Sequence, residues 1–126
     1  INEYELYGED IEYKIIQCIK YSIKINLEAI NKNINDCYAL FNLACILGMF
    51  NINESFDFFV RAEKNSDSQM KNIIYQEMTK INIDYNYALQ LEYADKAINF
   101  DGSNAYFYSH KGHILSKFGL YDDAIE

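Results

Sequence analysis

Residues 104–126 read NAYFYSHKGHILSKFGLYDDAIE, and this stretch decides the fold. The turn-forming residues Asp-Gly-Ser-Asn come just before Ala105 and predict that a helix begins there. Apolar residues then recur from Phe107 onward at helical spacing, which predicts one buried face. Gly119 interrupts the pattern, and an acidic pair follows that suits the positive end of a second helix beginning at Ala124. The stretch therefore predicts two helices joined by a short turn.

Small residues recur along the chain at a nearly constant step. Ala29, Ala62 and Ala97 lie 33 and 35 residues apart. A period in this range indicates stacked helix pairs, because a single pair cannot bury its own apolar face. Ala44, within DCYALFNLACILGMF, occupies the small position that Gly112 occupies later in the chain.

These residues resemble the tetratricopeptide repeat, whose pattern sets an aromatic residue four before a Gly, then a loop Gly, a Tyr and a small residue. The matching positions are Tyr108, Gly112, Gly119, Tyr121 and Ala124. The resemblance implies an all-α fold, an α-α superhelix of antiparallel helix pairs. It also implies that the absent side chain at Gly112 lets two helices approach closely.

The resemblance divides a single tetratricopeptide-like domain, residues 1–126, into four parts. They are a diverged N-terminal half-repeat or cap at 1–35, a repeat at 36–67, a diverged repeat at 68–102 and a truncated repeat at 103–126. In the diverged repeat Met78 and Gln90 replace small residues, so we expect looser packing there. We also expect the chain to be a fragment of a longer protein.

Two short segments, 23–27 and 81–85, alternate apolar and polar residues, which is the period of a strand. Helical spacing also runs through the first of them, with no Gly or Pro between Glu9 and Lys32, and favours a helix there. The second is better interpreted as a turn between two helices. The strand interpretation remains the alternative at both.

Composition argues against several classes of partner. The formal charge is -8, from 19 acidic and 11 basic residues, and this opposes binding to nucleic acid or to an anionic membrane surface. The sequence has no apolar run long enough to span a bilayer. Three cysteines cannot all pair within the chain and form no CxxC, which favours a reducing, cytoplasmic location.

The resemblance implies a concave groove lined by the first helix of each pair. Its candidate residues, mostly aromatic or uncharged and polar, are Tyr38, Phe41, Cys45, Asn72, Tyr75, Thr79, Asn82, Tyr106, Ser109, His113 and Ser116. Aromatic rings offer a large contact area, and Asn side chains pair with peptide backbone. Only Lys117, at the rim, would offer a cation. The alternative is that the tyrosines simply cover the helices of a Tyr-rich protein.

We therefore expect a non-catalytic scaffold that binds a partner peptide or helix. The sequence has no Gly-rich phosphate loop, Ser elbow or Cys–His arrangement, so no enzyme and no cofactor is expected. His110 and His113 are three apart but have no third ligand at helical spacing, so no metal site is expected. The alternatives are a structural or regulatory arm of a larger, possibly enzymatic, protein, and a homodimer through the truncated C-terminal end.

Overall fold

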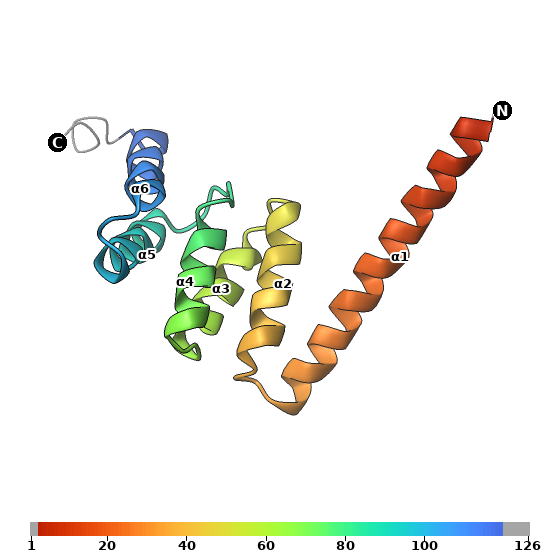
Figure 1. The fold of residues 1–126 in the computed structure, drawn as a ribbon, viewed down its shortest axis with the longest axis horizontal. Coiled ribbons are helices and arrows are strands. Elements are labelled where there is room, and N and C mark those ends of the chain that lie inside the picture. The colour runs from red at the N-terminus through yellow and green to blue at the C-terminus, as the bar shows by residue number, and fades with distance from the viewer. Residues whose placement is uncertain (1–2, 120–126) are drawn as a thin grey trace.

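The computed structural model describes residues 3–119, and this part of the chain is helical throughout, without a strand. The six helices are α1 (Glu3–Lys32), α2 (Cys37–Met49), α3 (Glu54–Lys64), α4 (Ser68–Met78), α5 (Tyr87–Phe100) and α6 (Ala105–Lys117). They follow one another across the molecule in chain order, from α1 on the right to α6 on the left (Figure 1). The predicted all-α class is confirmed.

Polar side chains begin the helices where the sequence places them. The Asp36 carboxylate accepts a hydrogen bond from the Ala39 backbone N–H at 3.1 Å, and Asn104 caps α6 by accepting one from the Tyr106 N–H at 3.0 Å. Such caps satisfy backbone N–H groups that have no partner inside the helix. The predicted start of α6 at Ala105 is confirmed.

The two segments with a strand-like pattern are not strands. Residues 23–27 belong to α1, and residues 81–85 form part of the connection between α4 and α5. Helical spacing, which favoured a helix at the first segment, is therefore the better guide there. The turn predicted at the second segment is confirmed.

The core is continuous from α2 to α6, because aromatic rings connect helices that are not consecutive in the chain. Phe56 of α3 meets Tyr93 of α5 edge to face, with ring centroids 5.9 Å apart, and Tyr75 of α4 meets Phe107 of α6 at 6.4 Å. Such geometry adds roughly 0.5–1.5 kcal/mol per pair to the area buried. One cluster of buried side chains thus unites the five helices.

Helices α2 and α3 pack closely against each other. The Ser55 hydroxyl donates a hydrogen bond to the Ala44 carbonyl at 2.8 Å, and both residues are fully buried. A Cβ added to Gly48 would lie 2.8 Å from the Ile81 Cγ2. The predicted close approach at Gly112 stays a prediction: among the described residues a Cβ added to Gly112 meets no atom within 4 Å. The second helix expected from Ala124, with Tyr121, lies outside the described residues.

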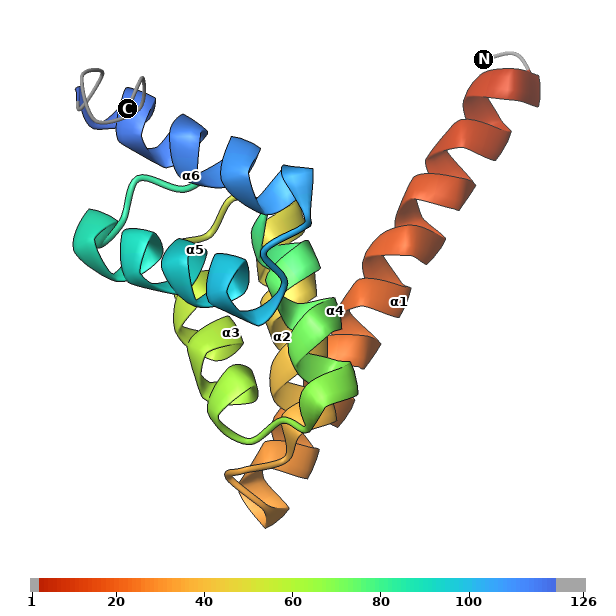
Figure 2. The same cartoon turned by 60° about the vertical axis from the view of Figure 1, so that its left-hand side comes forward.

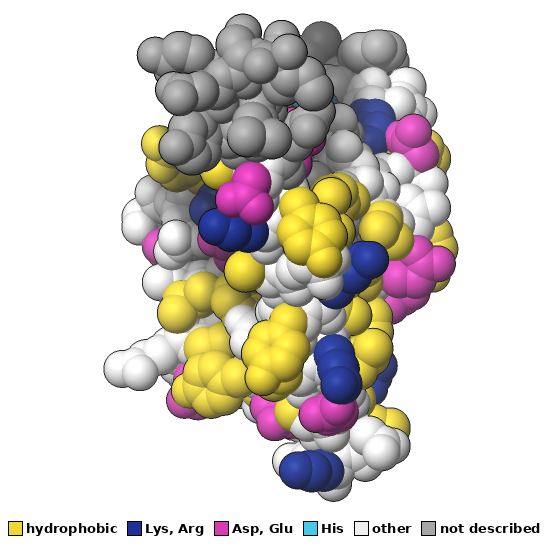
Figure 3. All heavy atoms as spheres, turned by 90° about the vertical axis from the view of Figure 1, so that its right-hand side faces the viewer, with side chains coloured by type: hydrophobic (Ala, Val, Ile, Leu, Met, Phe, Trp, Pro, Cys, Tyr) yellow, Lys and Arg dark blue, Asp and Glu magenta, His cyan; other side chains and the backbone are white. Residues whose placement is uncertain are grey.

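Helix α1 differs from the rest because much of it projects away from the folded body. It has 30 residues against 13 in α2, about 45 Å against about 20 Å. The two helices meet near the turn that joins them and diverge from there (Figures 1 and 2). Hydrophobic side chains are visible on the surface of this side of the molecule (Figure 3).

Candidate functional site

Two adjoining hollows lie between α4 and α6. The larger, of about 460 Å³, is lined by Gln76, Thr79, Lys80, Asn104, Tyr106 and Phe107. The smaller, of about 220 Å³, is lined by Thr79, Tyr106, Ser109, His110 and His113. They share Thr79 and Tyr106, and we refer to them together as the α4–α6 groove. Four of the residues predicted for a groove, Thr79, Tyr106, Ser109 and His113, are brought together here.

Tyr106 is the main apolar contact that the groove offers. The residue is 79% exposed, the highest value among the exposed large hydrophobic residues whose burial the structure describes, although it lies in the first turn of a capped helix. The next residue, Phe107, is fully buried against Tyr75 and fixes this turn of α6 on the core. A rigidly held helix turn therefore presents an accessible aromatic ring beside the hollow.

The α4 side of the groove is polar and nearly neutral. The Thr79 hydroxyl donates to the Gln76 carbonyl at 2.6 Å, and the Gln76 amide donates to the Asn72 side-chain oxygen at 3.2 Å. The Lys80 ammonium pairs with Glu77 at 2.8 Å, and this hydrogen bond is the largest of the causes that raise the pKa of Lys80. The charge of Lys80, next to the groove, is thus balanced by Glu77 one helical turn earlier.

His110 connects the groove to the interior. It lines the smaller hollow and also a void of about 10 Å³ whose other walls include Met78, Gln90 and Ala94. Burial, followed by the charge of nearby His113, lowers the pKa of His110 to about 4. The imidazole of His110 is therefore neutral at physiological pH, whereas His113 is exposed on the groove side of the same helix.

Tyr75 does not lie on an open surface as predicted. Its side chain is only 4% exposed and packs between Phe100, at 5.5 Å, and Phe107. Burial first, and then the negative charge of Glu63, raise the pKa of Tyr75 to about 12. A ring in the core cannot take part in a surface groove, so Tyr75 is a structural residue.

The other predicted residues border the α4–α6 groove or lie elsewhere. Asn72 touches its edge through Gln76. Tyr38, Phe41 and Cys45 belong to α2, and neither hollow includes them, nor Asn82 or Ser116. Lys117, expected as a free cation at the rim, is instead bound to the Asn82 side chain, the Ile83 carbonyl and the Asp84 carboxylate at 2.8–2.9 Å.

Five groove residues were not predicted from the sequence: Gln76, Lys80, Asn104, Phe107 and His110. Gln76 lies one turn before Thr79, so helical spacing from a predicted residue would have found it. Asn104 was recognised only as a cap. A residue that caps a helix lies beside the surface that the first turn of this helix faces. The predicted cap at Asn104 could therefore have been assigned to the groove as well.

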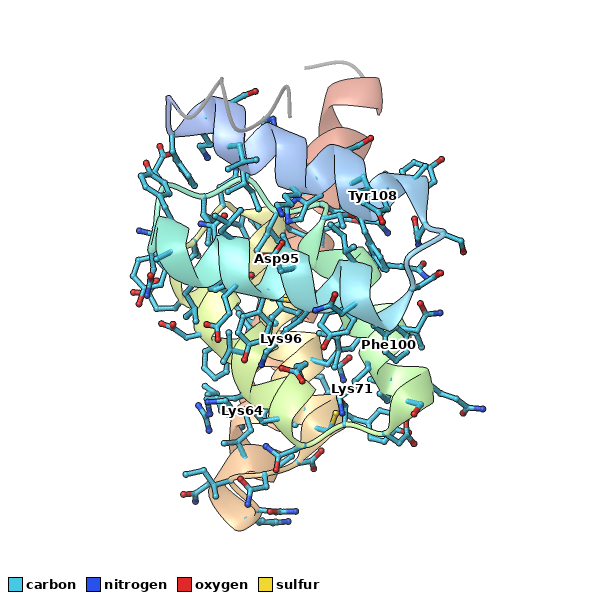
Figure 4. All side chains as sticks on the ribbon, turned by 90° about the vertical axis from the view of Figure 1, so that its left-hand side faces the viewer. Lys64, Lys71, Asp95, Lys96, Phe100 and Tyr108 are labelled. Atoms are coloured by element: carbon cyan, nitrogen blue, oxygen red, sulfur yellow. The ribbon has the colours of Figure 1, made fainter. Side chains whose placement is uncertain are left out.

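A buried carboxylate connects α3 and α5. Glu63 of α3 is buried, and its carboxylate lies 3.7 Å from the Lys96 ammonium of α5. Lys96 also stands 4.4 Å from the centre of the Tyr93 ring, and burial followed by the Glu63 charge raises the pKa of Tyr93. Lys96 lies between α5 and α3 on the face shown in Figure 4. These contacts fix the α3–α5 interface.

No model of a known protein family matches the chain. No curated protein matches it either. Cys18, Cys37 and Cys45 are free thiols, and burial raises the pKa of Cys45 to about 11. Within the described residues, no helix combines the length and the apolar character that crossing a bilayer requires.

Proposed function

We propose that this chain is a non-catalytic protein–protein interaction scaffold, and that it holds a short peptide or a helix of a partner in the α4–α6 groove. The observation that carries the proposal is the groove itself, a hollow of about 460 Å³ joined to one of about 220 Å³. A highly exposed tyrosine stands at the junction between them.

The lining favours an uncharged peptide segment. Tyr106 supplies apolar area with a hydroxyl at its tip, a combination that binding surfaces use often because few rotamers must be fixed. Thr79, Ser109 and Asn104 provide hydroxyl and amide groups suited to a peptide backbone. The Lys80 charge is balanced by Glu77, so the groove has no strong field to select an acidic partner.

The proposal includes a diverged tetratricopeptide-like arrangement in which α2, α4 and α6 are the first helices of successive pairs. It is supported by the alanine step near 34 residues and by the close contact of Ala44 with Ser55. The groove lies between two of these first helices. A cytoplasmic location is part of the same proposal and is supported by the free cysteines.

The groove is tested by panning the chain against a library of short random peptides and measuring affinities by calorimetry. We expect Tyr106→Ala to weaken the selected peptides by at least about 30-fold, because losing a central aromatic contact typically costs 2 kcal/mol or more. Tyr108→Ala is the matched control, since Tyr108 is also an exposed tyrosine of α6, at 52%, but lines neither hollow.

Two results would contradict the proposal. One is a set of selected peptides that lose affinity equally in both variants, which would place binding elsewhere on the surface. The other is a library that yields no binder to the wild-type chain. Gln76→Ala and Ser109→Ala should each weaken binding less than Tyr106→Ala does, because each removes polar contacts alone.

A further inference from the structure

Lys117, in the last turn of α6, reaches across to the α4–α5 connection. Its ammonium donates to the Asn82 side-chain oxygen at 2.8 Å and to the Ile83 carbonyl at 2.9 Å, and it pairs with the Asp84 carboxylate at 2.9 Å. An ammonium has three donors, which these three oxygens match. The Lys117 side chain is only 22% exposed, although that of Asp84 is 77% exposed. One cation therefore holds three consecutive residues of the connection against α6.

The α4–α6 groove lies between two contacts that join α6 to α4 and to the connection after α4. At the N-terminal end of α6, Phe107 packs against Tyr75 of α4, with ring centroids 6.4 Å apart. At the C-terminal end, Lys117 holds the α4–α5 connection, which passes beside α6 (Figure 2). The lining residues Thr79 and His113 each fall between the two contacts in their own segment. Buried rings therefore fix one end of the groove, and a cation with its three oxygens fixes the other.

The two sides of the groove have few other links to each other. Among the described helices, α4 and α6 each pack more extensively on α5 than on each other. The Lys80 ammonium pairs with Glu77, which lies on its own side of the groove. Lys111 of α6 pairs at 2.7 Å with a carboxylate of α5, not of α4. The spacing at the C-terminal end therefore depends on Lys117 and on the packing of both helices against α5.

We propose that Lys117 is a positioning residue of the α4–α6 groove, and that it sets the distance between the two sides by holding the α4–α5 connection. It acts without lining either hollow. Loss of its charge would leave the connection free to move away from α6 and the groove free to widen. A peptide would then bind only the fraction of molecules with the narrow groove, and its affinity would fall by that fraction. The link to peptide binding rests on the proposed function, whereas the spacing itself does not.

The spacing is measured first, without any ligand. Nitroxide labels on unnatural residues at Lys80 and His113, one on each side of the groove, report its width by pulsed electron spin resonance and leave the three cysteines unchanged. We expect Lys117→Met to broaden the distance distribution and shift it to longer values. Asp84→Asn, which weakens one of the three contacts, should do so less. Lys111→Met is the matched control and should keep the wild-type distribution, because its ion pair joins α6 to α5.

Binding is measured next, with unlabelled chains and the peptides selected on the wild type. We expect Lys117→Met to weaken these peptides at least about fivefold, which corresponds to a groove of native width in a fifth of the molecules or fewer. Asp84→Asn should weaken them less, and Lys111→Met should leave their affinity unchanged. Urea unfolding shows which variants are folded under the assay conditions. If Lys117→Met does not fold, Asp84→Asn decides the question.

Three results would overturn the proposal. The first is a distance distribution that neither Lys117→Met nor Asp84→Asn changes. The second is equal broadening in Lys111→Met, which would mean that α6 loosens when any of its ion pairs is lost. The third is a widened groove that binds the selected peptides as tightly as the wild type. If no peptide is selected at all, the proposed function fails by itself, because the label distances still decide whether Lys117 sets the spacing.

Discussion

The α2–α3 pair and the α4–α5 pair solve the same packing problem with different residues. In the first, Ala44 and Ser55 are small and fully buried, so the two helices approach until a side-chain hydroxyl reaches a backbone carbonyl at 2.8 Å. In the second, Met78 and Gln90 stand in the corresponding places and are also buried. Met78 and Gln90 also line the void of about 10 Å³, so the second pair is less completely filled.

The difference shows what a large residue requires at a helix crossing. Helices α4 and α5 are joined by a longer connection than α2 and α3. The buried Gln90 amide compensates by donating hydrogen bonds to the carbonyls of Ile83 and Tyr85 in that connection. Small residues let two helices pack closely because their side chains take little space. Gln90 instead holds the α4–α5 connection in place through its hydrogen bonds. The stability of the α2–α3 pair should therefore fall when side-chain volume is added, and that of the α4–α5 pair when the polar group of Gln90 is removed.

We expect the largest loss of stability when the pH is lowered, and it should arise at the α4–α5 pair, which is the less completely filled of the two. His110 lines the void there, and its pKa is about 4 in the folded chain against about 6.5 when unfolded. Between these values the unfolded chain binds a proton that the folded chain does not. The stability contribution is therefore complete above pH 6.5 and is lost as the pH falls toward 4, by roughly 3 kcal/mol.

Urea unfolding at several pH values measures this loss in the wild-type chain and in two variants. His110→Gln should unfold with a free energy that falls less between pH 6.5 and 4, because the variant has no group to titrate there. His113→Gln should keep most of the wild-type dependence, because burial, which the variant leaves in place, is the larger cause of the lowered pKa of His110. Equal pH dependence in all three proteins would show that His110 is not buried against the void.

Added volume at the close pair should have the next largest effect. A Cβ at Gly48 would lie 2.8 Å from Ile81 and 3.0 Å from the Ser55 hydroxyl, so Gly48→Val should cost about 1–3 kcal/mol of unfolding free energy. Gly112→Val makes the same change in α6, where the added atoms meet open space within the described residues. Thermal and urea unfolding should show a loss in the first variant and little change in the second. A similar loss in both would contradict the tight contact at Gly48, since helix propensity alone favours Val over Gly in both variants.

Local signals in the sequence were enough to predict the helical class and much of the helix order. Asp and Asn caps and helical spacing marked the start of α6 and identified residues 23–27 as helix against their alternating pattern. These signals act within a few residues, so the sequence displays them directly. Ala44 was also assigned to a small position, and the Ser55 hydroxyl of α3 reaches its carbonyl there.

The candidate site was predicted only in part, because exposure depends on how helices are rotated against one another. Tyr75 and Tyr106 were both assigned to the groove, yet one lies in the core and the other is 79% exposed. The neighbours Phe100 and Phe107 decide this, and they meet Tyr75 only after α4, α5 and α6 have packed. Lys117 was similarly predicted at the rim, because its bonds to the α4–α5 connection join residues that are distant in the sequence.

Removing the polarity of Gln90 should have the smallest of these effects and completes the comparison between the two pairs. Gln90→Leu keeps a similar volume but leaves the Tyr85 carbonyl without its donor, whereas the Ile83 carbonyl still accepts from Lys117 at 2.9 Å. We expect a loss of about 1–2 kcal/mol in unfolding free energy, measured by urea denaturation. Gln69→Leu, at an exposed position of α4, should stay within about 0.5 kcal/mol of the wild type. If Gln90→Leu were instead as stable as the wild type, the connection would not depend on this amide, and the α4–α5 pair would be held by its apolar contacts alone.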